Sequence, residues 1–343
     1  MRDKPCGDLR VYLEVEIRRV NCKGCGKVKG EHLPWMGSPF YTRRFAFYVG
    51  KRCQSSSIRE VADELNVDWR TAKSMEMDYM REKLQKVGKP KPNAVGIDEI
   101  SVRKGHKYRI VVSDLERHQP IWFGGKDRTE ESMDLFWEEL GPQKAEKVRL
   151  AVMDMWEAFE NSAVKNAPQA AILYDKFHVM RKLGEAMDAV RRIEYRNLPA
   201  DEKIFIKGNR YILLSHRQNL DLKGRTRLKK LLAANKKLNT AYILKESFGQ
   251  LWDYKYPGAA RRFFDNWKAT LKKQDLKPYE KFAHTVERHW EGIVAHCKPE
   301  NRVSLGFVEG LNNKIRVMQR RAYGLRDEDY LRLKVLTCTL PNF

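Results

Sequence analysis

The sequence has no long hydrophobic run and few cysteines, and each absence excludes a class of protein. No stretch of about eighteen apolar residues occurs, so we expect no membrane-spanning helix, and the basic N-terminal stretch lacks a signal-peptide core. Six cysteines among 343 residues are too sparse for a disulfide-stabilised scaffold. We therefore expect a soluble protein of the cytoplasm, long enough for about two or three domains.

Positive charge, in contrast, is abundant. Lysine and arginine number 67 against 45 aspartate and glutamate residues, which gives a net charge of +22. Such an excess favours a polyanionic partner, and nucleic acid is the first candidate. Residues 201–300 hold 22 basic and 11 acidic residues, half of the whole excess. Helical patterns in this block, for example 228–238, predict a helical subdomain whose aromatic rings are mostly core. An exposed ring would be able to stack on an unpaired base, and the lysines are either a solvated face or a binding surface.

Near the N-terminus, Cys22 and Cys25 have the spacing of a zinc knuckle. They make only half of a tetrahedral site. A zinc-ribbon-like region over residues 1–54 would bind a structural Zn²⁺ ion through Cys6, Cys22, Cys25 and a fourth ligand from Asp3, His32 or Cys53. The alternative is a set of reduced surface thiols in a turn.

Two capped helices are predicted over residues 55–65 and 68–84, joined at Asn66, which tolerates a left-handed turn. This pattern is typical of a helix-turn-helix, within a region that ends at about residue 90. An ordinary helical hairpin is the alternative, and the basic net charge favours DNA binding. In a helix-turn-helix, three residues of the second helix would face the major groove: Trp69, Arg70 and Lys73.

After a linker over residues 86–92, the run 94–101 (AVGIDEIS) predicts a buried strand that leaves the core at Asp98. Two further runs at hairpin spacing predict two neighbouring strands. Residues 148–153 predict another strand, which ends on Asp154. Alternating strands and helices then continue to about residue 200. Together they indicate a mixed sheet covered by helices, an α/β class.

Residues 304–319 predict a capped helix. Glu309 lies beside its apolar stripe, on one predicted face with Asn312, Asn313 and Arg316.

Three acids share one kind of position: Asp98, Asp154 and Glu309 each lie at the end of a predicted strand or on the face of a predicted helix, next to apolar residues. If such carboxylates converge, a divalent ion resolves their repulsion, and Mg²⁺ prefers these oxygen ligands. Two ions about 3.5–4 Å apart promote in-line displacement at a phosphodiester. The simpler interpretation of an acid at a strand end is a turn residue. Glu99 is excluded from the triad because strand alternation sends it to the face opposite Asp98.

Four segments resemble the DDE transposases of bacterial insertion sequences: GIDEIS with Asp98, VMDMWEAF with Asp154, YDKFHVM with Asp175 and His178, and VEGLNNKIRVMQRRAYGLRD with Glu309. The resemblance covers essentially the whole chain and is strongest to the ISL-three family, which also has a cysteine ribbon and a helix-turn-helix. It implies an RNase H-like core over residues 93–200 and 301–343, interrupted by an all-α insertion at 201–300. The cysteine ribbon departs from the family pattern because it lacks a complete first pair, which predicts a shortened or degenerate zinc site.

The resemblance also implies roles for individual residues. Asp98, Asp154 and Glu309 would be the catalytic triad. His178 belongs to a D-x-x-H motif, and it either contacts the scissile phosphate or organises the site, or else packs as a structural residue. Several polar residues of the Glu309 segment would contact the DNA backbone: Asn313, Lys314 and Arg316, with Arg320 and Arg321 either doing the same or remaining solvated.

We expect the protein to be a transposase that binds insertion-sequence ends through residues 1–90. It would cut and rejoin DNA strands with two Mg²⁺ or Mn²⁺ ions. Its partners would be the terminal inverted repeats and target DNA, bound by a homodimer associated with the bacterial nucleoid. Two alternatives stay open. One is a sequence-specific DNA-binding regulator with a silent catalytic scaffold, and the other is an RNase H-like nuclease without strand transfer.

Overall fold

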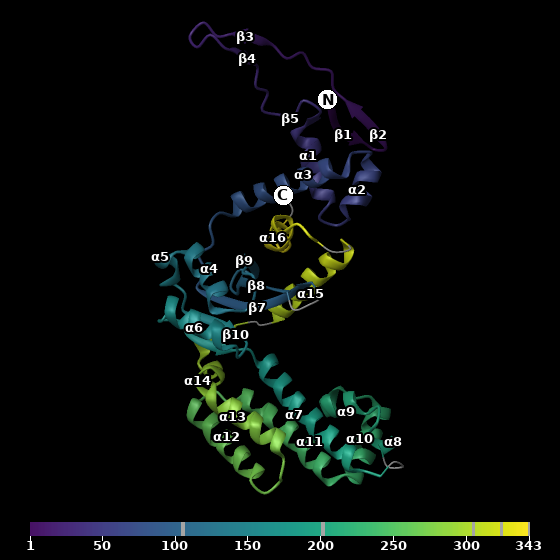
Figure 1. Cartoon of the computed structure of the whole chain (residues 1–343), viewed down its shortest axis with the longest axis vertical. Coiled ribbons are helices and arrows are strands. Elements are labelled where there is room, and N and C mark those ends of the chain that lie inside the picture. The colour runs from purple at the N-terminus through teal and green to yellow at the C-terminus, as the bar shows by residue number, and fades with distance from the viewer. Residues whose placement is uncertain (104–106, 200–202, 304–305, 323–324, 342–343) are drawn as a thin grey trace. The chain divides into compact units, whose positions relative to one another are not determined.

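The computed structural model describes residues 1–103, 107–199, 203–303, 306–322 and 325–341. They form two compact units (Figure 1). The first unit comprises Met1–Pro90, His118–Gly124 and Val308–Phe343, and the second comprises Lys91–Arg117 and Gly125–Phe307. Among the described residues, no helix is both long and apolar enough to cross a bilayer.

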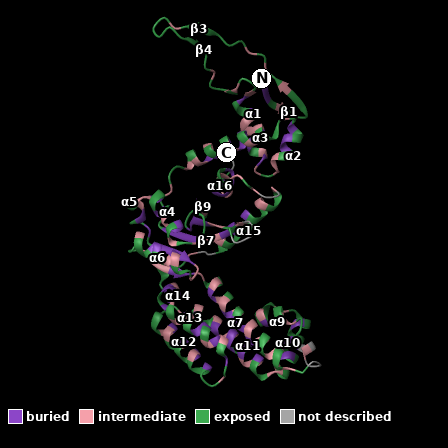
Figure 2. Ribbon diagram, in the orientation of Figure 1, coloured by how far each residue is buried: buried purple, intermediate pink, exposed green. Residues whose placement is uncertain are grey.

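The first unit begins with two small sheets. Its larger sheet has the order β2-β1-β6-β5, with the strands Leu9–Tyr12, Arg2–Cys6, Tyr41–Thr42 and Met36–Ser38. Buried Asp3 on β1 accepts a hydrogen bond from Thr42 Oγ1 at 2.7 Å and pairs with Arg44, which ties the sheet to the next helix. The smaller sheet is a hairpin whose strand residues are all exposed (Figure 2), formed by β3 (Arg19–Asn21) and β4 (Val28–Gly30).

Three helices follow the sheets: α1 (Arg43–Arg52), α2 (Ile58–Leu65) and α3 (Trp69–Val87). The predicted pair, α2 and α3, is confirmed. Ser57 and Asp68 cap these helices, and Asn66 is left-handed with a φ of 49°. The pattern does not predict α1, because its Phe, Tyr and Val residues have low helix propensity. Phe45 and Val49 of α1 nevertheless complete the apolar core that α2 and α3 share.

The chain ends with α15 (Gly306–Arg321) and α16 (Glu328–Thr337), and α16 packs against α3 and β9 (Gln119–Gly124). Glu76 of α3 is fully buried in this packing. Its carboxylate accepts the Tyr330 O–H at 2.5 Å and pairs with Lys334 Nζ at 2.5 Å. Burial raises the pKa of Glu76, whereas Lys334 and Tyr330 act in the opposite direction. Lys334 and Tyr330 therefore stabilise the ionised form of the Glu76 carboxylate, which burial alone would disfavour.

Replacing Lys334 with methionine is expected to destabilise the first unit by about 3–5 kcal/mol, because the buried Glu76 carboxylate loses its cation. The deficit should shrink as the pH falls, since a protonated Glu76 needs no counter-charge. Thermal unfolding at several pH values measures both effects. Lys86→Met is the matched control, since Lys86 and Glu82 form an exposed pair at 3.5 Å. Equal losses in the two variants would contradict this role of Lys334.

In the second unit, a sheet runs in the order β11-β10-β7-β8, with the strands Ala171–Tyr174, Leu150–Met153, Ala94–Arg103 and Lys107–Asp114. β7 pairs antiparallel with β8, while β10 pairs parallel with both β7 and β11. Helices of this part of the unit are α4 (Glu130–Leu140), α5 (Pro142–Ala145) and α6 (Glu157–Asn166). The predicted α/β class with a mixed sheet is confirmed, and the arrangement is consistent with an RNase H-like core.

Helices alone make up the rest of the second unit (Figure 1). They are α7 (Lys176–Asn197), α8 (Lys203–Ile206), α9 (Arg210–Leu214), α10 (Leu222–Ala234), α11 (Lys236–Phe248), α12 (Pro257–Leu271), α13 (Lys277–Arg288) and α14 (Trp290–Val294), with 3₁₀ turns at Arg217–Asn219, Gly249–Asp253, Ala295–Cys297 and Pro299–Asn301. The helical pattern predicted over 228–238 is confirmed, but the helix is interrupted at Asn235. Asn235 is extended and its side chain accepts the Leu238 N–H at 2.8 Å, so it caps α11 and separates it from α10.

Aromatic residues form the core of this helical part, as predicted. Phe264 stacks between Trp267 and Trp290, with ring centroids 6.3 and 5.1 Å apart, and all three side chains are buried. Exceptions include Tyr211 and Tyr256, with 74% and 75% of their surfaces exposed. Burial inside α11–α13 and exposure along α10 are visible in Figure 2.

Replacing Gly292 with alanine is expected to destabilise the second unit by about 1–3 kcal/mol, because a Cβ on this residue of α14 would overlap the ring of Tyr174 on β11. Chemical denaturation measures the loss. Gly258→Ala in α12 is the matched control, since nothing lies within 4 Å of a Cβ there. Alanine at that position should be neutral or stabilising. A Gly292→Ala variant as stable as this control would mean that Tyr174 moves aside freely.

Candidate active site

Three aspartates lie at the same edge of the sheet. The last residue pair of β7 and β10 is Gly96 with Val152, and Asp98 and Asp154 each lie two residues further on. Asp175 follows β11 in the same way, and its N–H donates to the Met153 carbonyl at 2.9 Å. Because parallel strands end together at one edge, the register brings Asp98, Asp154 and Asp175 side by side.

The position of Asp98 corrects one detail of the sequence prediction. β7 does not end at Asp98 but continues to Arg103, because β8 pairs with it along this length, with Val111 opposite Asp98. It is the neighbour β10 that ends early. The Asp98 carboxylate accepts the N–H of Glu99 at 2.8 Å.

His178 lies close to two of these carboxylates, those of Asp154 and Asp175. Its Nδ1 is 4.0 Å from Asp154 Oδ2 and its Nε2 is 3.9 Å from Asp175 Oδ2, distances too long for hydrogen bonds. Asp154 Oδ1 and His178 Nδ1 are buried and have no hydrogen-bond partner among the described residues. Asp175, in contrast, caps α7 by accepting the Phe177 N–H at 2.8 Å. Asp154 and His178 are therefore the side chains whose polar atoms remain available to a ligand.

The pKa values of Asp154, Asp175 and His178 are shifted in different directions. Burial, followed by the charge of Glu99, raises the pKa of Asp154 to about 6. Burial likewise raises the pKa of Asp175. Burial and the positive charge of Arg181 lower the pKa of His178, so this histidine is neutral at pH 7 while Asp154 is mostly ionised.

Arg128 is a residue of this region that sequence reasoning missed. It pairs with Glu99 at 3.2 Å, its guanidinium lies 4.6 Å from the Trp156 ring centroid, and its carbonyl accepts the Trp156 indole N–H at 2.7 Å. Glu99, excluded from the triad by strand alternation, thus has a cation of its own while its charge acts on Asp154 and His178. No motif signals Arg128, because it lies in the loop before α4.

Arg181 and Lys182 were missed as well. They lie one turn after His178 on α7, and their charges lower the pKa values of both Asp154 and His178. Neither has an acidic partner among the described residues. The i+3 and i+4 spacing from His178 is the signal that would have found them.

Glu309 belongs to the first unit, in the first turn of α15, where it is exposed. The predicted cap Ser304 lies outside the described residues. Asn313 and Arg316 are also exposed, and Arg316 donates to Asn313 Oδ1 at 3.2 Å. The predicted common face is wrong for Asn312, which is buried beside Leu311 because it falls on the apolar side of the helix.

Family comparisons agree with the resemblance read from the motifs. A family model described as "Transposase" matches residues 95–335, and one described as "Helix-turn-helix domain of transposase family ISL3" matches residues 40–79. The chain belongs to the ISL3 family of transposases. It is 35% identical over 339 residues to the transposase for insertion sequence element IS1001 of Bordetella parapertussis. The aligned region covers 98% of this chain and 83% of that protein. It is 24% identical over 354 residues to the transposase for insertion sequence element IS1557 of Mycobacterium tuberculosis, covering 95% and 78% respectively.

A transposase with a helix-turn-helix domain binds DNA, and four of its predicted DNA-binding residues share one groove. The groove has a volume of about 1180 Å³ and is lined by Trp69 and Lys73 of α3 and by Lys314 and Arg321 of α15, all within the first unit. Lys73 is already ion-paired there, since its Nζ lies 2.6 Å from Asp327 Oδ2. The other predicted residues, Arg70, Asn313, Arg316 and Arg320, are exposed outside the groove lining.

The three predicted zinc-binding cysteines of the transposase are divided between two sheets. Cys22 and Cys25 lie in the β3–β4 turn, where hydrogen bonds from Cys25 and Gly24 lower the pKa of Cys22, as a zinc-binding thiolate requires. Cys6 ends β1 in the other sheet. Of the suggested fourth ligands, Asp3 is bound by Arg44, and burial raises the pKa of Cys53 to about 12. Within the described ranges, no three His, Cys, Asp or Glu side chains are already grouped around one ion position.

Proposed function

We propose that this transposase cuts and rejoins DNA at the ends of its insertion sequence, with Asp98, Asp154 and Glu309 as the metal-binding carboxylates. The observation that carries the proposal is the buried Asp154 Oδ1 atom without a hydrogen-bond partner among the described residues. An ionised oxygen left in this way is costly unless a cation binds it. The in-register Asp98 supplies a second oxygen ligand at the same sheet edge. Glu309 is included because its segment matches the family motif.

The carboxylates would hold two Mg²⁺ or Mn²⁺ ions, which when bound would lower the pKa of an attacking hydroxyl and offset charge on the leaving oxygen. Water would attack first and a freed 3′-hydroxyl second. His178 is neutral at pH 7, so one ring nitrogen carries a proton that it can donate to a phosphate oxygen. Arg181 and Lys182 would attract the DNA backbone to the same place.

End recognition is assigned to residues 1–90, with the groove beside α3 as its basic part. We propose that Cys22 and Cys25 supply two ligands of a structural Zn²⁺ site, which Cys6 would join only if the hairpin moved. A homodimer is proposed because joining requires two DNA ends to be held together.

The test uses the full-length protein and a labelled duplex that carries the element's own ends. We expect 3′-hydroxyl cleavage products and joined products in Mg²⁺, and neither in EDTA. Cleavage without joining would favour an RNase H-like nuclease. Tight, sequence-selective binding without cleavage in any divalent metal would favour a DNA-binding regulator and contradict the proposal.

The pKa of Asp154 gives this activity an expected pH dependence. The carboxyl must lose its proton to bind a cation, and its pKa of about 6 means that it is largely protonated at pH 5.5. The Mg²⁺ concentration needed for half-maximal cleavage should therefore rise about fourfold between pH 7 and pH 5.5. Titrations of Mg²⁺ at fixed pH values measure it. A requirement that stays constant over this range would mean that Asp154 does not bind the metal.

A further inference from the structure

One helix of the insertion carries an unusual density of positive charge. α10 contains no acidic residue and has five exposed cations within eight positions: Lys223, Arg225, Arg227, Lys229 and Lys230. None of the five is ion-paired within the part of the chain that the structure describes. Arg225 donates a hydrogen bond to the Gln218 carbonyl at 3.1 Å.

The five cations form two rows along the helix. Lys223, Arg227 and Lys230 follow the i, i+4, i+7 spacing of one row, and Arg225 and Lys229 follow the i, i+4 spacing of another. Residues of the opposite side, Gly224, Leu228 and Leu231, are buried against the rest of the insertion. The two rows therefore border the outward face of α10. Like charges at these spacings repel one another, so the bare helix is electrostatically unfavourable on its own.

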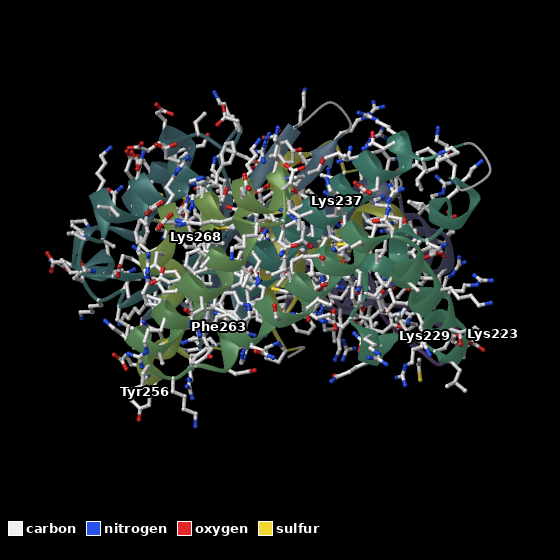
Figure 3. All side chains as sticks on the ribbon, turned by 90° about the horizontal axis from the view of Figure 1, so that it is seen from below. Lys223, Lys229, Lys237, Tyr256, Phe263 and Lys268 are labelled. Atoms are coloured by element: carbon white, nitrogen blue, oxygen red, sulfur yellow. The ribbon has the colours of Figure 1, made fainter. Side chains whose placement is uncertain are left out.

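Two cations elsewhere in the same subdomain are neutralised by acidic partners. Lys237 Nζ lies 3.1 Å from Asp275 Oδ2, and Lys268 pairs with Glu287. Figure 3 shows Lys223 and Lys229 near each other at one end of the insertion, with Lys237 and Lys268 elsewhere on it. Exposed cations without an ion pair among the described residues also occur on α11–α13, for example Lys236, Arg262 and Lys281, but each of those helices carries acidic residues as well. α10 differs because it has no acidic residue, so its positive charge is not offset within the helix.

We propose that the outward face of α10 binds the phosphodiester backbone of double-stranded DNA without reading its sequence. The charge pattern is complementary to rows of phosphates, and exposed lysine and arginine without carboxylate partners are the groups that release counterions on binding. Apart from Leu222, the outward side has no large apolar residue, so insertion into a lipid surface is disfavoured. This proposal rests on the proposed function, since both require DNA as the substrate.

The test compares two double variants that each remove two lysine charges from the insertion. Lys223→Gln/Lys229→Gln removes unpaired charges, and Lys237→Gln/Lys268→Gln removes paired ones. Fluorescence anisotropy of the full-length protein gives the affinity for an end-bearing duplex and for an unrelated duplex over a range of salt concentrations. Circular dichroism establishes that both variants are folded.

We expect Lys223→Gln/Lys229→Gln to flatten the plot of log K against log salt by about 1.8, since each phosphate contact contributes about 0.9. The change should be equal on both duplexes, whereas Lys237→Gln/Lys268→Gln should leave the slope unchanged. Equal slopes for the two variants, or a loss confined to the end-bearing duplex, would overturn the proposal. Failure of the proposed function would give a different result: the wild type would show no preference for the end duplex and no cleavage. The role of α10 could still be tested in that case from the salt dependence of binding to the unrelated duplex.

Discussion

Asp154→Asn is expected to lower the rates of DNA cleavage and strand joining on the order of 10³-fold or more. Asparagine keeps the shape of the side chain and removes the charge that binds a cation. The effect should be large because Asp154 Oδ1 is buried without a hydrogen-bond partner among the described residues, so neighbouring side chains do not already satisfy it. Single-turnover cleavage of end-bearing DNA measures the loss.

Glu157→Gln is the matched control for this substitution. Glu157 lies three residues further on, in the first turn of α6, and is exposed. Its replacement should change the cleavage rate less than about twofold, because surface substitutions rarely disturb a buried site. DNA binding should persist in Asp154→Asn. Comparable rates for Asp154→Asn and Glu157→Gln would show that Asp154 has no catalytic role.

Local sequence patterns predicted the elements that position this site. The runs that end on Asp154 and Asp175 are strands, and Asp68 caps a helix as predicted, because these features depend on neighbours in the chain. The other predicted helix, α2, begins at Ile58 after Ser57 rather than at residue 55. The sequence also allowed the prediction that Asp98 and Asp154 lie near each other, since parallel strands separated by helices end at one edge of a sheet.

Features that depend on distant contacts could not be predicted in this way. α1 is helical although its residues favour strands, because Phe45 and Val49 complete a core with α2 and α3. The pair of Glu76 and Lys334 joins α3 to α16, and neither position has a signal in its own neighbourhood. Arg128 was missed for the same reason, because its partner Glu99 lies on a strand far away in sequence.

Glu309→Gln is the second substitution expected to lower cleavage on the order of 10³-fold. Glu309 is exposed in the first turn of α15, so the loss of its charge should leave the helix and its buried Leu311 and Ile315 intact. The variant should therefore bind end DNA like the wild type and fold normally, while losing chemistry. Glu300→Gln is the control, since Glu300 is also exposed and lies shortly before α15.

The most direct measurement is cleavage and joining of a labelled duplex carrying the element's own ends, by the wild type and by Glu309→Gln, in Mg²⁺ and in EDTA. The account predicts 3′-hydroxyl ends and joined products for the wild type in Mg²⁺ alone, and neither product for Glu309→Gln in either condition. Cleavage by Glu309→Gln at the wild-type rate would contradict the assignment of the third carboxylate, and cleavage by the wild type in EDTA would contradict metal-dependent chemistry.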